Sequence, residues 1–246
     1  MSDRDVDRLL NQLSSLGKDI NYIDKHGNNL LINGIIKGRI KYVLTLIKAG
    51  VDVNFHNKMW QTALMYIESK GGEDSIAMLR ALIKKGADTN KQNYFGETAM
   101  IIAAMNLGEY SEEILRLLID AGANPNIQDV SGKTALMYAT HNIEEDNGSE
   151  YSEGILRLLI DVGADPNMLD VSEMTALMFA VQHGNEHVAG MIRLLLDVGV
   201  DTNKQNWIGW TALMYAAENG GDYAEDIIHK LVNSGADINI KNKNNE

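Results

Sequence analysis

Internal repetition is the feature that most constrains how this chain can fold. The tetrapeptide Thr-Ala-Leu-Met begins at Thr62, Thr134, Thr175 and Thr211, and a near copy begins at Thr98. A second pattern, Gly-x-(Asp/Asn)-x-Asn, begins at Gly17, Gly50, Gly86, Gly122, Gly163, Gly199 and Gly235. By subtraction, the intervals between these glycines are 33, 36, 36, 41, 36 and 36 residues. Seven patterns in register predict a stack of similar units rather than one closed core.

Each repeated unit predicts a turn followed by two short helices. Residues 127–133 are polar and contain the Gly and Asp that suit a tight turn. Thr134 then precedes an apolar segment, where its hydroxyl can accept a hydrogen bond from a first-turn N–H. A second apolar segment, residues 152–162, ends at Gly163, which suits the left-handed end of a helix. Helices this short are marginal alone in water, so each pair must pack against the next pair.

The turn, the Thr-x-Leu segment, the helix pair and the Gly-Ala-Asp-x-Asn pattern together resemble the ankyrin repeat. The resemblance implies an all-α repeat solenoid of stacked helix pairs joined by β-hairpin-like turns. Residues 1–246 would form a single domain, with about six repeats in residues 19–240. Residues 1–18 would form an N-terminal capping half-repeat, and residues 241–246 a polar tail after an uncapped last repeat. Long, Asn- and Ile-rich units of this kind are similar to arrays encoded by giant DNA viruses or intracellular bacteria.

Three departures from the family pattern carry expectations of their own. The family's His is replaced by Met65, Met137, Met178 and Met214, which predicts a drier core packed by flexible side chains. Extra residues fall between the helices of the longer units, and residues 142–150 are expected to form a mobile acidic loop. Trp60 and Glu173 stand where the other turns have glycine. Because a positive φ is rare for such residues, we expect these two turns to change type.

Charge and composition exclude several classes of partner. The formal net charge is -12, from 22 Lys and Arg against 34 Asp and Glu. This sign argues against nucleic acid and anionic membranes, and favours a protein partner with a basic surface. The chain has no cysteine, so disulfides and thiolate sites are excluded. No apolar run is long enough to span a membrane, and a cytoplasmic location is expected.

The sequence offers little catalytic chemistry. It contains no Gly-rich phosphate loop, no Gly-x-Ser-x-Gly and no His-Glu-x-x-His motif. His183 and His187 are four residues apart, but Gly184 and Asn185 place them in a loop, so they predict no metal site. Acidic residues gather at the starts of second helices, where the helix dipole favours them. We therefore expect no enzyme activity, no metal and no cofactor.

A binding surface is predicted at the turn tips and on the concave face of the first helices, where partners generally contact ankyrin repeats. Nine aromatic residues occupy these positions: Trp60, Tyr66, Tyr94, Phe95, Tyr138, Phe179, Trp207, Trp210 and Tyr215. Aromatic side chains are enriched among interface anchors, which favours partner binding. The alternative is that they pack against neighbouring layers within the chain.

Three functional hypotheses follow from this surface. The leading one is a non-catalytic, monomeric module that binds another protein through the turn tips and the concave helix face. The alternative is a structural element that associates with other copies through its uncapped C-terminal repeat. An enzyme is the third and weakest hypothesis. The resemblance also implies that Asn90, Asn126 and Asn167 are similar to positions that asparagine hydroxylases modify.

Overall fold

The computed structural model describes residues 3–16, 19–67, 72–141, 148–183, 188–219 and 223–245. The chain groups into two compact units. Unit 1 comprises Met1–Asn106 and Glu113–Ala123, and unit 2 comprises Leu107–Glu112 and Asn124–Glu246. No observation tests the single domain that the sequence predicts, and it stays a prediction.

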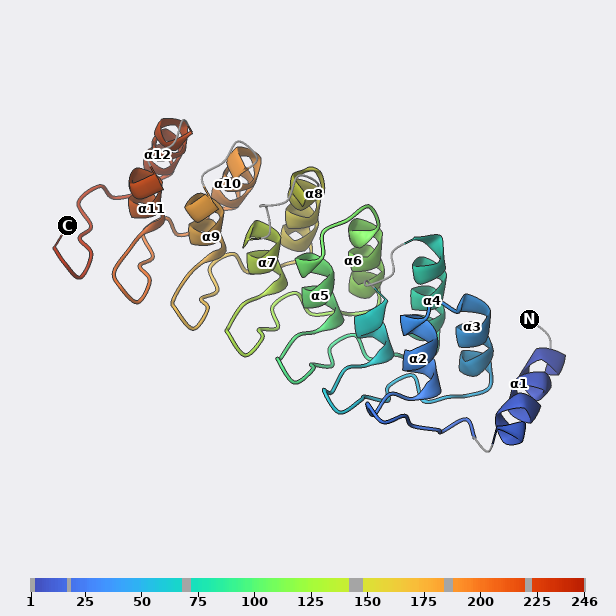
Figure 1. Ribbon diagram of the computed structural model, residues 1–246. Coiled ribbons are helices and arrows are strands. Elements are labelled where there is room, and N and C mark those ends of the chain that lie inside the picture. Colours follow the sequence, from blue (N-terminus) through green and yellow to red (C-terminus); the bar gives the residue numbers. More distant parts are fainter. Residues whose placement is uncertain are drawn as a thin grey trace. The chain divides into compact units, whose positions relative to one another are not determined.

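Unit 1 is built from short helices in the order that the sequence predicts (Figure 1). They are α1 (Asp3–Ser15), α2 (Leu30–Ile36), α3 (Ile40–Lys48), the 3-10 helix η1 (Ala63–Tyr66), α4 (Glu73–Lys84), α5 (Ala99–Met105) and most of α6 (Ser111–Asp120). The first helices α2, η1 and α5 pack in succession, and α3 packs against α4. The terminal helix α1 contacts α3 through the buried Leu9 and Leu13, while Leu10 and Leu16 are exposed.

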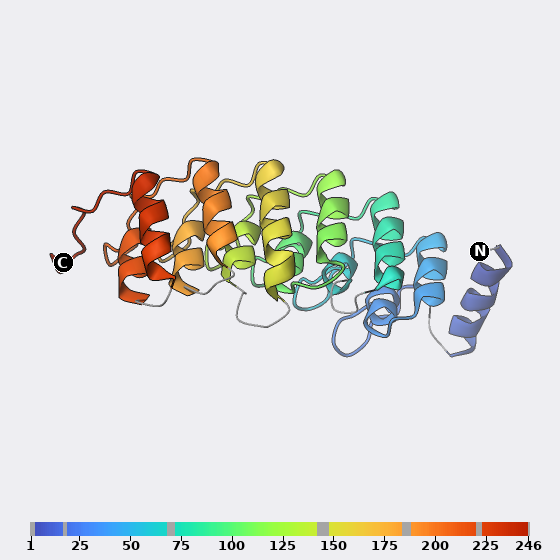
Figure 2. The same ribbon diagram turned by 90° about the horizontal axis from the view of Figure 1, so that it is seen from above.

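Unit 2 repeats one helix pair three times. The first helices are α7 (Ala135–His141), α9 (Ala176–His183) and α11 (Ala212–Asn219). The second helices are α8 (Gly148–Asp161), α10 (Val188–Asp197) and α12 (Ala224–Asn233). Each set forms a row, with α9 between α7 and α11, and α10 between α8 and α12 (Figures 1 and 2). The apolar faces of the two rows meet, and this contact forms the core.

The repeated threonine begins the first helices by capping them, as predicted. The hydroxyl oxygens of Thr134, Thr175 and Thr211 accept hydrogen bonds from the N–H groups of the residues three further on, at 3.2–3.3 Å. Thr62 differs, because its helix is 3-10 and its buried hydroxyl oxygen makes no well-aligned hydrogen bond among the described residues, although it faces the N–H of Met65 in a capping box.

The methionines that replace the family's histidine lie in the core. Met65, Met137 and Met178 are buried, whereas Met214 is half-buried. Two of the thioethers accept a hydrogen bond from the N–H of the threonine three residues earlier, Met65 from Thr62 at 3.4 Å and Met214 from Thr211 at 3.5 Å.

A hairpin turn precedes each first helix and is held by its first residue, which we call the turn anchor. The anchors are Asp24, Asn57, Asn93, Asp129, Asp170 and Asn206. The N–H of each anchor donates to the carbonyl oxygen four residues later, as from Asp129 to Lys133 at 3.0 Å. Its side-chain Oδ1 accepts from the N–H groups two and four residues later, both at 2.8 Å for Asp170. Carboxylates and amides in this arrangement form Asx turns.

The expectation that Trp60 and Glu173 change the turn type was wrong. Both residues have φ 59°, while Gly27, Gly96, Gly132 and Gly209 have φ between 76° and 85°. All of them donate their N–H to the anchor three residues earlier, at 3.0 Å for Trp60 and 2.9 Å for Glu173. The anchor's hydrogen bonds fix the turn, so the side chain accepts the left-handed conformation near its ideal φ of about 57°.

The predicted boundary before the second helix of the 41-residue interval also needs correction. Helix α8 begins at Gly148, so residues 148–150 are helical rather than part of an acidic loop. The rest of the predicted mobile loop, residues 142–147, lies outside the described residues.

The asparagine that ends each repeat pattern joins one layer to the next. The Asn126 side chain donates to the carbonyl oxygen of Gly163 at 3.0 Å and accepts from the N–H of Asp165 at 2.7 Å. Asn54 makes the same pair of bonds with Gly86 and Asp88. These bonds explain why the pattern keeps both its first glycine and its last asparagine in register.

Candidate functional site

The turn tips form an exposed apolar ridge in each unit. In unit 1 it consists of Met59, Trp60, Tyr94 and Phe95, and in unit 2 of Val130, Val171 and Trp207. Successive tips are tied by main-chain hydrogen bonds, in which Tyr94 donates to Met59 at 2.9 Å and Trp207 donates to Ser172 at 3.1 Å. The ridge therefore presents its side chains from a backbone that is itself hydrogen-bonded.

The aromatic side chains at the tips divide into exposed and partly packed ones. Trp207 is 59% exposed. Trp60 is 57% exposed, and its ring stacks on His56 with centroids 4.6 Å apart. Tyr94 and Phe95 contact each other edge to face at 5.6 Å. Trp210 is half-buried, and its ring packs against that of Tyr215 with centroids 5.1 Å apart. Trp210 is therefore less exposed than the neighbouring Trp207.

Three of the predicted aromatic residues on the first helices, Tyr66, Tyr138 and Tyr215, hydrogen-bond to the anchors of their own turns. The Tyr138 hydroxyl donates to Oδ2 of its own anchor, Asp129, at 2.6 Å. In two other turns the anchor is an asparagine and the direction is reversed. The amide nitrogens of Asn57 and Asn206 donate to the hydroxyl oxygens of Tyr66 and Tyr215 at 3.0 and 2.8 Å. Burial raises the pKa of Tyr215; the Asn206 hydrogen bond opposes this, while the Asp170 charge adds to it. Phe179 has no hydroxyl and is 5% exposed.

A pocket of about 440 Å³ lies between successive turns of unit 2. Its apolar lining comes from Val171, Met174, Phe179, Trp207, Ile208 and Tyr215, and its polar lining from Ser131, Lys133, Asp170, Ser172, Gln182 and Asn206. The pocket thus brings together Phe179, Trp207 and Tyr215 from the nine predicted residues. Tyr138 and Trp210 lie in the same unit without lining it. Trp60, Tyr66, Tyr94 and Phe95 belong to unit 1.

Two charged side chains line this pocket without pairing with each other. The Lys133 ammonium lies 4.7 Å from the centre of the Phe179 ring and 5.5 Å from that of Tyr138. Such a contact between a cation and an aromatic face is attractive. Asp170 is only 9% exposed. Sequence reasoning missed Asp170; the signal was Phe179, the residue nine positions later, where three other units have Tyr.

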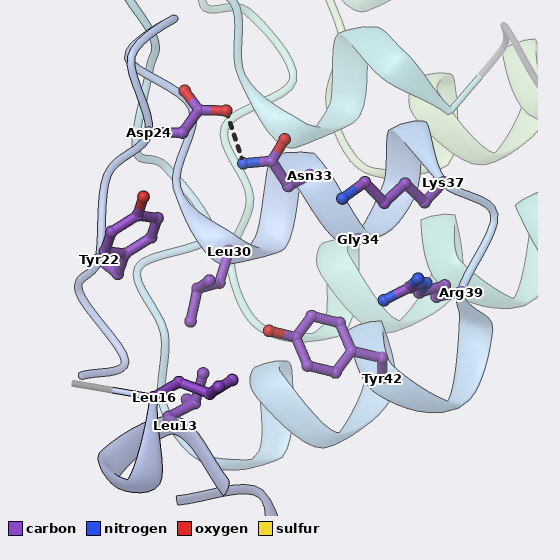
Figure 3. A pocket seen from close by; sticks show the side chains of 10 residues that line it. All are labelled: Leu13, Leu16, Tyr22, Asp24, Leu30, Asn33, Gly34, Lys37, Arg39 and Tyr42. Carbon is purple, nitrogen blue, oxygen red and sulfur yellow. Dashed lines mark hydrogen bonds between the residues drawn. The ribbon is translucent and has the colours of Figure 1, made fainter. Parts of the chain in front are cut away.

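Unit 1 contains a smaller pocket of about 260 Å³ between α1, α2 and α3 (Figure 3). Leu13, Leu16 and Tyr42 face its apolar side, while Lys37 and Arg39 lie at its other side. The Asp24 carboxylate accepts a hydrogen bond from Asn33 at 3.0 Å. Burial would raise the pKa of Asp24, but hydrogen bonds from Asn33 and from the N–H groups of Asn28 and His26 outweigh it and lower this pKa from its ordinary value. Asp24 and Asn33 are thus hydrogen-bonded to each other within the chain. None of the nine predicted residues lines this pocket.

Among the described residues, no three His, Asp or Glu side chains group as metal ligands would. Residues 184–187, which include part of the His183–His187 pair, lie outside the described residues. Within the described ranges, no helix is long and apolar enough to cross a membrane.

Comparison with known folds gives a consistent result. The ankyrin repeat domain of Bcl-3, a member of the IκB protein family, matches with a TM-score of 0.72 and 26% identity, over 90% of this chain and 92% of that one. An ankyrin repeat domain from Acinetobacter baumannii matches with a TM-score of 0.71 and 23% identity, over 84% and 98% of the two chains. The predicted all-α repeat solenoid of stacked helix pairs is confirmed.

The family comparison agrees with the structural one. A search of curated proteins found no significant match. The model describing ankyrin repeats in three copies matches residues 67–151 and 147–242, which together are more than half of the chain. Ankyrin repeats are generally protein–protein interaction modules and typically lack catalytic activity. The chain belongs to the ankyrin repeat family.

Proposed function

We propose that this chain is a non-catalytic module that holds a protein partner on its turn tips and on the concave face of its first helices. The observation that carries the proposal is the unit 2 pocket, where the exposed Trp207 stands beside an apolar lining. Large aromatic side chains next to a pocket are the usual anchors of protein interfaces. The net charge of -12 favours a partner with a basic surface over nucleic acid or an anionic membrane. A monomer in the cytoplasm fits this role.

Replacement of Trp207 by alanine tests the proposal. The ring is exposed, so we expect Trp207→Ala to leave helical content unchanged while weakening partner binding by about 2 kcal/mol, or roughly 30-fold. The partner is first captured on immobilised wild-type chain, and its affinity is then measured by calorimetry. Arg193→Ala, an exposed change on the second helix α10, serves as the matched control. Equal affinities for wild type and Trp207→Ala would contradict the proposed surface.

Self-association through the last repeat is the second candidate. It is favoured by exposed apolar side chains in that repeat, where Val232 and Ile238 are 41% and 71% exposed. Light scattering at increasing protein concentration would show a rising mass, and Val232→Lys with Ile238→Lys would abolish the rise. A constant monomer mass in the wild type would rule this candidate out.

A further inference from the structure

Each turn anchor has two polar atoms on its side chain, and the structure pairs nearly all of them. Oδ1 holds the turn in every case. The second atom is paired in five of the six turns from Asp24 to Asn206. Asp24 accepts from Asn33, Asn57 donates to Tyr66, Asn93 donates to Glu97, Asp129 accepts from Tyr138, and Asn206 donates to Tyr215.

Asp170 is the exception among these turns. Nine residues after it stands Phe179, which cannot supply the hydroxyl that Tyr138 and Tyr215 supply in the flanking repeats. Four residues after it stands Met174, whose sulfur instead accepts from Asn206 at 3.3 Å. Within the described part of the chain, Oδ2 of Asp170 has no hydrogen-bond partner, and no ion pair joins Asp170 to Lys133.

The surroundings of the Asp170 carboxylate favour a positively charged hydrogen-bond donor as its partner. Asp170 is only 9% exposed, and it lines the pocket together with Phe179, Trp207 and Tyr215. Because Asp170 lines the pocket and its Oδ2 is not sealed in the core, a guest's N–H groups can reach this oxygen and bond to it. The rings can face the same guest, because a guanidinium stacks on aromatic faces while donating from its edge. The position of the Lys133 ammonium over Phe179 shows that this ring accepts a cation.

We propose that the unit 2 pocket is a seat for an arginine side chain of the protein partner, with Asp170 Oδ2 as its acceptor and the aromatic side chains as its walls. The inference rests on the proposed function and specifies which chemical group of the partner the pocket binds. Lys133 competes for the Phe179 ring, so its removal favours the guest. The charge complementarity agrees with the acidic balance of the whole chain.

The direct test titrates the full-length chain with three capped pentapeptides of alanine that carry arginine, citrulline or glutamate at the centre. Citrulline keeps the shape of arginine and removes its charge. The readout is the indole N–H signal of Trp207 in two-dimensional NMR, with the Trp60 indole as an internal reference. We expect only the arginine peptide to shift the Trp207 signal, with binding that weakens as salt is added.

Four variants locate the seat. Asp170→Asn is compatible with the fold, because Asn57, Asn93 and Asn206 occupy this position in other turns. It should weaken arginine-peptide binding by about ten-fold. Phe179→Tyr should weaken it too, because the new hydroxyl can donate to Oδ2 as Tyr138 does to Asp129. Lys133→Met should strengthen binding. Asp129→Asn is the matched control, since Oδ2 of Asp129 is already occupied, and it should bind like the wild type.

Several outcomes would overturn the seat while leaving the proposed function intact. They are an unshifted Trp207 signal with the arginine peptide, equal binding by Asp170→Asn and wild type, or tighter binding of the glutamate peptide that Lys133→Met abolishes. Partner capture that depends on Trp207 but not on Asp170 would also reject only the seat. Asp170-dependent peptide binding without capture of any protein would instead reject the proposed function.

Discussion

At the scale of single residues, the turns show how local hydrogen bonds override a conformational preference. Trp60 and Glu173 adopt φ 59° because each anchor, Asn57 or Asp170, holds three N–H groups of its turn. Sequence reasoning identified the conformation from the glycines at the equivalent positions. It did not weigh the anchor bonds against the strain, and so it predicted a different turn.

Glu173→Gly is expected to stabilise the protein. A left-handed conformation costs a non-glycine residue about 1–2 kcal/mol, while glycine loses an additional 0.5–1 kcal/mol, roughly, in chain entropy on folding. Because Glu173 is exposed, few contacts are lost. The free energy of unfolding in urea should therefore rise by about 0.5–1 kcal/mol. Gly132→Ala should have the opposite effect and destabilise the protein, because the added Cβ would lie 2.8 Å from the main-chain nitrogen of Val171.

At the scale of helices and turns, the predictable parts are those set by neighbours in sequence. Thr134, Thr175 and Thr211 cap first helices, as their position before an apolar segment indicates. The start of α8 was missed, because Gly148 and two polar residues are as typical of a loop as of a first turn. Thr62 has the same sequence context as Thr134 but a different geometry, which no local pattern predicts.

The two threonines should respond differently to the same change. Thr134→Val removes the acceptor for the N–H of Met137 and should destabilise by about 1 kcal/mol, the usual effect of losing an N-cap. Thr62→Val removes a buried hydroxyl that faces the N–H of Met65 without a well-aligned hydrogen bond among the described residues, and it should cost clearly less stability than Thr134→Val. Chemical unfolding of both variants gives the comparison. Equal losses would mean that Thr62 caps its helix in solution.

At the scale of the whole molecule, the repeats explain what the sequence revealed and what it concealed. The period and the paired helices were predictable, since every layer must present the same surface to the next. The candidate pocket was predictable only in part. Phe179, Trp207 and Tyr215 were named, but Asp170 became visible once the structure showed that Tyr138 reaches an anchor nine residues earlier. Such a reach depends on how a turn folds over its helix.

The asparagines between layers give the last prediction, because a repeat protein is held together by contacts between neighbours. Asn126 joins two layers of unit 2 through Gly163 and Asp165, whereas the Asn239 side chain bonds, among the described residues, only to Asp237 in its own turn. Asn126→Ala removes two hydrogen bonds and should lower the free energy of unfolding by about 1–2 kcal/mol. Asn239→Ala should have little effect, although both residues end the same sequence pattern. Urea unfolding followed by circular dichroism measures both. A similar loss in the two variants would show that the asparagine stabilises its own turn, and that the layers are coupled by apolar packing alone.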